Sequence, residues 1–228
     1  MQRKVAIAGG SGLVGSYILQ GLLADPSVKE VHALGRRPLN MLHSKLKMHV
    51  SDLSSIPPLP LLDEVYLAVG TTIRTAGSQA AFRRIDFEAN LAIARAAIVS
   101  GANRIGLVSA IGADKQSKVF YNRVKGELEY ALGQLETEAL VIARPSLLLG
   151  DRKALGQHSR LGEKVAAVVL KAFNPIVPFA YRPIEARKVA QALLLLVPSI
   201  TGSIVLSSKA LLKYGCTVRH RKHFDRQS

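Results

Sequence analysis

The chain has 228 residues, of which 48% are hydrophobic and only 5% aromatic, with no tryptophan. This length fits a single α/β domain with a small additional part, and the aliphatic composition suits buried parallel strands covered by helices. The formal net charge is +15, which raises the question of an acidic partner such as nucleic acid. The basic residues are scattered and are not interleaved with aromatic residues, so the pattern argues against nucleic-acid binding.

The single cysteine, Cys216, excludes a disulfide framework and fits a reducing compartment. The apolar run Val5 to Ala8 is too short for the core of a signal peptide, and the later run Ala192 to Val197 is too short to span a bilayer. We therefore expect a cytoplasmic protein that makes no membrane contact. The six histidines show no ligand spacing with carboxylates or with Cys216, so no metal site is expected.

Short apolar segments alternate with helical patterns along the first two thirds of the chain. The expected strands cover residues 4–8, 30–34, 46–50, 64–69, 104–109 and 138–143, and the expected helices cover 13–23, 80–100 and 120–135. Three prolines exclude a strand or a helix interior from residues 54–62. This βαβ alternation predicts an α/β fold with a doubly wound parallel sheet of the Rossmann type.

The pattern changes after Gly150, where the chain becomes basic and then rich in proline. The expected elements of this part are helices over 162–173 and 185–196 and a last strand over 203–206. We expect residues 1–212 to form one domain, in which 151–212 cover the substrate side of the sheet. Residues 213–228 are basic and turn-prone, and we expect them to be a disordered tail.

A glycine-rich turn separates the first expected strand from the first expected helix. It reads Gly9-Gly10-Ser11-Gly12-Leu13-Val14-Gly15. Glycines let the chain bend tightly and let its backbone approach a pyrophosphate, while the following helix presents free N–H groups to the anion. The strand, turn and helix succeed one another as this motif requires, so we predict that the pyrophosphate of a dinucleotide binds here.

The end of the second expected strand indicates which dinucleotide is bound. Sites for NAD place an acidic residue about twenty residues after the glycines, where it bonds the ribose 2′-hydroxyl. Here the chain reads Gly35-Arg36-Arg37, with no acid. Guanidinium groups pair well with a 2′-phosphate, which an acid would repel, so the sequence predicts NADP(H). A solvated position for one or both arginines is the alternative.

Tyr121 and Lys125 lie four residues apart and so share one face of the expected helix over 120–135. An ammonium beside a tyrosine favours the phenolate, which makes the pair suitable for proton transfer, and the lysine is also able to hold ribose hydroxyls. Ser109 ends an expected strand at the edge where ligands bind, where it is placed to polarise a carbonyl. A plain turn serine fits that position equally well. Asp86 and Glu88 are interpreted as helix N-terminal charges.

The glycine turn, Ser109, Tyr121 and Lys125 together resemble the short-chain dehydrogenase/reductase superfamily, in particular its extended and atypical branches. The segments that narrow the resemblance are 34–37, 70–72, 109–114, 121–127 and 144–152. They resemble the family of the Tat-interactive protein oxidoreductases and their bacterial relatives. The resemblance runs from about Lys4 to about Leu211.

This resemblance implies an atypical short-chain reductase that binds NADPH. The cofactor contacts it implies are Gly9, Ser11, Gly12, Leu13, Val14, Gly15, Arg36, Arg37, Val69, Gly70, Asn90, Tyr121, Lys125, Leu148 and Arg160. The catalytic residues it implies are Ser109, Tyr121 and Lys125. The chain departs from the family at Ala110, where some relatives have a second serine, and over residues 214–228, which differ from the usual short ending.

The expected activity is reduction of an unidentified carbonyl substrate, with hydride from the nicotinamide and a proton from Tyr121. Two alternatives stay open: a regulatory or sensor protein that holds NADPH and acts through protein partners, and a sugar-nucleotide epimerase or dehydratase. The short part after Gly150 is small for a nucleotide-sugar pocket. The two long expected helices, 80–100 and 120–135, are of the kind that pair in many superfamily dimers, so a homodimer is also expected.

Overall fold

The computed structural model describes residues 2–53, 55–150 and 183–217. In these residues the strands are β1 (Arg3–Ala8), β2 (Val28–Gly35), β3 (Leu46–Val50), β4 (Glu64–Leu67), β5 (Arg104–Val108), β6 (Ala139–Arg144), β7 (Leu148–Leu149), β8 (Ile184–Glu185) and β9 (Gly202–Ser207). The helices are α1 (Leu13–Ala24), α2 (Ile73–Ala76), α3 (Gln79–Arg83), the π-helix η1 (Arg84–Ala89), α4 (Asn90–Val99), α5 (Phe120–Gly133), α7 (Ala186–Leu196) and α8 (Ser208–Thr217).

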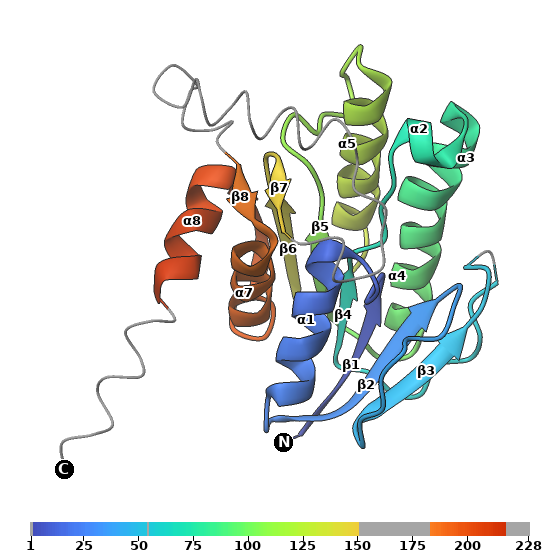
Figure 1. Ribbon diagram of the computed structural model, residues 1–228, viewed down its shortest axis with the longest axis vertical. Helices are drawn as coiled ribbons and strands as arrows, with labels where there is room; N and C mark the ends of the chain where they lie inside the picture. The colour runs from blue at the N-terminus through green and yellow to red at the C-terminus, as the bar shows by residue number, and fades with distance from the viewer. Residues whose placement is uncertain (1, 54, 151–182, 218–228) are drawn as a thin grey trace.

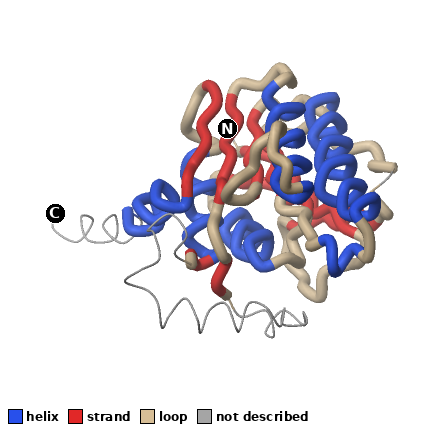
Figure 2. Tube along the Cα trace, turned by 90° about the horizontal axis from the view of Figure 1, so that it is seen from above, coloured by secondary structure: helices blue, strands red, loops and turns tan. Residues whose placement is uncertain are grey.

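Seven of the described strands form one parallel sheet in the order β3-β2-β1-β4-β5-β6-β9. Helices α1, α7 and α8 cover one face, and α4 and α5 cover the other (Figure 1). Seen from above, the strands lie between these two groups of helices (Figure 2). Central strands buried on both faces explain the continuous apolar runs, and the doubly wound parallel sheet is confirmed.

The strand order reverses at β1, which pairs with β2 on one side and β4 on the other. Chain that leaves the carboxyl end of β1 enters α1 on one face, and chain that leaves β4 enters the helices of the opposite face. The two connections therefore diverge and leave a crevice above the ends of β1 and β4. Ligands of open α/β sheets bind in such a crevice.

The helix expected over residues 80–100 is confirmed as one continuous helical stretch, made of α3, η1 and α4, whose middle part is a π-helix. The hydroxyl of Thr72 caps α2, and the hydroxyl of Ser78 accepts the N–H of Ala81 and begins α3. Between α3 and α4 the chain widens into the π-helix η1. The periodicity of apolar residues does not reveal capping side chains or a π-turn. π-turns occur frequently at functional sites.

The part of the chain after residue 182 belongs to the main body. Strand β9 extends the sheet beside β6, and α7 packs on α1 through residues such as Leu193 and Leu194. Helix α8 continues to Thr217, five residues into the stretch expected to be a disordered tail. The remaining parts of the expected cap and tail, residues 151–182 and 218–228, lie outside the described residues.

Two glycines of α5 provide a test of how closely this helix packs. A Cβ at Gly126 would lie 2.2 Å from the carbonyl carbon of Asp114, whereas a Cβ at Gly133 would meet no atom within 4 Å. We expect Gly126→Ala to lower the free energy of unfolding by about 1–3 kcal/mol or more, as overpacking does. Gly133→Ala on the same helix should leave it unchanged or raise it by up to about 1 kcal/mol. Urea unfolding measures both, and equal effects would contradict the close packing of Gly126.

Candidate functional site

The turn between β1 and α1 brings two pieces of backbone into direct contact. Gly9 has a φ of 84°, and a Cβ there would lie 2.5 Å from the carbonyl carbon of Ala68 at the end of β4. A Cβ at Gly15 would lie 2.1 Å from the carbonyl oxygen of Gly9, which also accepts the N–H of Gly12 at 2.8 Å. These positions therefore require glycine for steric reasons.

The first turn of α1 is suited to hold an anion. Its N-cap is Gly12, and among the described residues no side chain caps the helix and no acid occupies its first turn. Leu13 and Val14 point into the core, with 5% exposure each, so they offer only backbone N–H groups to the surface. Free N–H groups and the positive end of the helix dipole suit a pyrophosphate.

A hollow of about 360 Å³ adjoins this turn at the carboxyl ends of β2 and β3. Among its lining residues are Gly9, Gly10, Ser11, Gly35, Arg36, Arg37, Asn40, Met48, His49 and Val50. Both arginines are exposed, and the described lining contains no carboxylate. The hollow thus brings the glycine turn and the two arginines together, as a dinucleotide with a 2′-phosphate requires.

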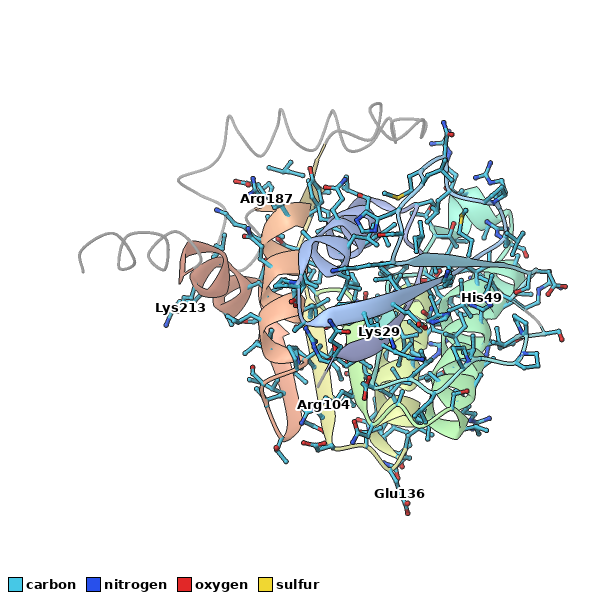
Figure 3. All side chains as sticks on the ribbon, turned by 90° about the horizontal axis from the view of Figure 1, so that it is seen from below. Lys29, His49, Arg104, Glu136, Arg187 and Lys213 are labelled. Atoms are coloured by element: carbon cyan, nitrogen blue, oxygen red, sulfur yellow. The ribbon has the colours of Figure 1, made fainter. Side chains whose placement is uncertain are left out.

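A pair of histidines extends from this hollow into the sheet. His49 Nε2 lies 3.0 Å from His32 Nδ1, and His32 Nε2 lies 3.2 Å from the carboxylate of Glu30. Figure 3 shows His49 beside β2 and β3, well separated from the labelled Arg187 and Lys213. Burial lowers the pKa of both histidines, and the neighbouring His32 lowers that of His49 further. Sequence spacing could not reveal this pair because it depends on the β2–β3 register.

The end of β4 is tied to the π-helix by Asn90, which is fully buried. Its Nδ2 atom donates to the carbonyl oxygens of Val69 at 3.1 Å and Asp86 at 3.0 Å. Its buried Oδ1 atom has no hydrogen-bond partner among the described residues. Asn90 thus positions Val69 and the exposed Gly70 beside the crevice, where the family resemblance expects the cofactor.

Tyr121 and Lys125 lie on the face of α5 that meets η1. Lys125 is buried, and its Nζ atom lies 2.7 Å from Oδ1 of Asp86, whose side chain has 0% exposure. Burial alone would lower the pKa of Lys125, but the Asp86 carboxylate and the Tyr121 hydroxyl raise it above its ordinary value. The Tyr121 ring packs against Phe82 of α3, with 5.2 Å between ring centroids.

From the sequence, Asp86 is interpreted as a charge at a helix N-terminus, and the structure gives it a different role. It is completely buried, and besides Lys125 it accepts the backbone N–H of Thr71 at 2.9 Å. Glu88, which was interpreted in the same way, is exposed. Asp86 lies in the π-helix η1, and its carboxylate is directed toward the chain that follows β4.

Ser109 follows β5, as expected, and its side chain is buried. Its hydroxyl donates to the carboxylate of Glu129 on α5. The same carboxylate pairs with the guanidinium of Arg144, with 3.0 Å between Nε and Oε1. This network adjoins a second, wider hollow of about 560 Å³. The role of Ser109 toward a substrate stays a prediction.

Two predicted cofactor contacts remain, Leu148 and Arg160. Leu148 is in β7, is half-buried, and packs against the cluster formed by α1 and α7. Arg160 lies outside the described residues. In the described part of the chain no three His, Cys, Asp or Glu side chains are grouped to hold a metal ion. The described helices include none that is long and apolar enough to cross a membrane.

The sequence is similar to fungal proteins that carry one name. It is 34% identical over 185 residues to protein fmp52, mitochondrial, of Emericella nidulans, covering 76% of this chain and 77% of the relative. It is 32% identical over 213 residues to protein FMP52, mitochondrial, of Eremothecium gossypii, covering 90% of this chain and 94% of the relative. No family model matches the chain.

Solved structures share the fold at low sequence identity. A short chain dehydrogenase family protein from Francisella tularensis superposes with a TM-score of 0.66 at 16% identity, covering 93% of this chain and all of its own. A UDP-N-acetylglucosamine 4-epimerase from Methanobrevibacter ruminantium reaches 0.67 at 17%, covering 90% of this chain and 76% of the other. The chain therefore shares the Rossmann fold of these proteins.

The names of the relatives correct one expectation. The cytoplasmic location expected from composition is wrong, because the curated relatives at 32–38% identity are named mitochondrial proteins. The presence of only one cysteine argues against an oxidising compartment. It does not distinguish the cytoplasm from other reducing compartments.

The histidine pair predicts a pH dependence of stability. Because the pKa of each histidine is lowered on folding, the unfolded chain binds protons first as the pH falls through about 6.5. This contribution to the free energy of unfolding should therefore be fully present well above that pH and be lost as the pH falls below it. We expect His49→Gln to reduce this loss and His43→Gln, at an exposed loop position, to leave it unchanged, as measured by urea unfolding. Equal pH dependence in both variants would contradict the role of the pair.

Proposed function

The chain belongs to the FMP52 family, and we propose that it is an NADP(H)-dependent oxidoreductase that reduces a carbonyl substrate. The observation that carries the proposal is the position of Lys125. A Cβ at Gly70 would lie 3.7 Å from its Nζ atom, so the ammonium lies beneath exposed backbone at the end of β4. The glycine turn lies against the end of the same strand. One dinucleotide that follows this edge would contact both.

NADP(H) is supported by the residues around the first hollow. The pyrophosphate would lie on the N-terminus of α1, against the backbone of Gly12, Leu13 and Val14. The 2′-phosphate would lie between Arg36 and Arg37, where the described lining holds no acid. The orphaned Oδ1 of Asn90 and the side-chain-free backbone at Gly9 and Gly15 also fit a ligand in the crevice.

The chemistry follows from the pair on α5. NADPH, when bound, supplies the hydride that reduces the carbonyl carbon. The hydroxyl of Tyr121 donates its proton to the carbonyl oxygen, so that an alcohol forms and a phenolate remains. The ammonium of Lys125 stabilises that phenolate and donates to the ribose hydroxyls. Proton uptake from solvent then restores Tyr121.

Two further assignments belong to this proposal. A mitochondrial location follows from the names of the relatives. Ser109 would polarise the carbonyl only if its hydroxyl turned away from Glu129, so we assign the proton transfer to Tyr121. The narrower resemblance to the Tat-interactive protein oxidoreductases stays a prediction.

The arginines test the choice of cofactor. We expect the double variant Arg36→Ala/Arg37→Ala to weaken NADPH binding by about tenfold to a hundredfold, because charge-assisted hydrogen bonds to the 2′-phosphate are lost. Binding of NADH should change by less than about threefold, since it lacks that phosphate. Fluorescence titration measures both constants. Arg95→Ala, at an exposed position of α4, is the control. A similar loss for both nucleotides would refute the assignment.

Tyr121 tests whether the bound nucleotide is used in catalysis. Against a panel of aldehydes and ketones, we expect Tyr121→Phe to lower kcat by about a hundredfold to ten-thousandfold, because the proton donor is removed. The dissociation constant of NADPH should change little. Tyr130→Phe is a matched control, because Tyr130 lies on the same helix with 52% exposure. Tight NADPH binding by a wild type that reduces no carbonyl would instead support the sensor alternative.

A further inference from the structure

A buried carboxylate, Asp86, lies at the centre of the site without a part in the proposed reaction. Its Oδ1 atom is 2.7 Å from Lys125 Nζ, and the two side chains are 0% and 5% exposed. We propose that Asp86 is the positioning residue of Lys125, which keeps the ammonium protonated and directed at Gly70, where the ribose of a dinucleotide would lie. This inference rests on the proposed function.

The orientation of Asp86 is set by the end of β4. Its Oδ2 atom accepts the backbone N–H of Thr71 at 2.9 Å, which leaves Oδ1 directed toward Lys125. The carbonyl oxygen of Asp86 accepts Nδ2 of Asn90, and the same Nδ2 holds Val69. The π-turn of η1 thus fixes the carboxylate between β4 and α5, so Lys125 meets an already ordered partner.

Lys125 requires a partner because it is buried. Burial alone lowers the pKa of a lysine, and Asp86 is the first of the groups that counteract it. The other groups that raise this pKa are Tyr121 and Glu129, both on α5. Glu129 is already paired with Arg144 of β6 and hydrogen-bonded to Ser109. Asp86 is therefore the carboxylate on which the charge of Lys125 depends.

The pair also lies where a ligand would reach it. An ideal Cβ at Gly70 would be 3.5 Å from Asp86 Oδ1 and 3.7 Å from Lys125 Nζ. Gly70 is exposed and has no side chain of its own to cover the pair. A paired ammonium in this place offers hydrogen bonds to neutral hydroxyls while adding little net charge.

The first experiment measures NADPH binding by fluorescence. We expect Asp86→Asn to raise the dissociation constant by about tenfold, the loss of one hydrogen bond from a charged donor. Glu88→Gln makes the same charge change at an exposed position of η1 and should have no effect. In a Lys125→Met background, Asp86→Asn should change binding by less than about twofold, because its effect acts through the lysine. An equal loss in both backgrounds would overturn the proposal and leave Asp86 with only its Thr71 contact.

The second experiment needs no nucleotide. The pKa of Lys125 is raised in the wild type, so its stabilising contribution is present at neutral pH and is lost only as the pH rises through that raised pKa. In Asp86→Asn, burial should lower this pKa, so stability is lost as the pH falls from about 10. The deficit in Tm relative to the wild type should therefore be larger at pH 7 than at pH 10.

The double variant Lys125→Met/Asp86→Asn keeps this test decisive even if Asp86→Asn folds poorly. Removing both charges should restore most of the lost Tm, because the buried unpaired ammonium is gone. A deficit that is independent of pH and is not restored by Lys125→Met would overturn the pairing. A wild type that does not bind NADPH would refute the proposed function, whereas the unfolding comparison by itself decides whether Asp86 maintains the charge of Lys125.

Discussion

Backbone lies directly on backbone where β1, α1 and β4 meet. The carbonyl oxygen of Gly9 fills the space that a side chain on Gly15 would need, and the backbone of Ala68 fills the corresponding space beside Gly9. This close packing brings the N-terminus of α1 down to the carboxyl edge of the sheet, at the point where the strand order reverses. In open α/β sheets this is the place where ligands bind.

Charge is distributed unevenly along this edge. The end near β2 and β3 carries Arg36, Arg37 and His49, and no carboxylate lines the described hollow there. The end near α5 carries Lys125, whose charge is balanced by Asp86. A ligand with its phosphates at one end and a neutral reacting group at the other matches this distribution. The net charge of +15 alone would not have indicated it, because the basic residues are scattered along the sequence.

Elements with a strong local signal could be predicted from the sequence. The strand over residues 46–50 has the bounds expected, and α5 begins at Phe120 as expected, because apolar period and breaking residues determine both. The short helix α2 and the π-turn inside the following helix could not be predicted in this way. They depend on the hydroxyls of Thr72 and Ser78 and on one widened turn, none of which alters the apolar period.

At the site, the contacts that could not be predicted from the sequence are side-chain pairs between distant parts of the chain. The His32–His49 contact requires the β2–β3 register, and the Ser109–Glu129 bond requires α5 to lie over β5. For the Asp86–Lys125 pair, the sequence contains one local indication that Asp86 points inward. Asp86 stands four residues before Asn90, so both occupy one helical face, and an amide expected beside the crevice places that face inward. An acid on an inward face must find a cation, and Lys125 was the cation already assigned to the crevice.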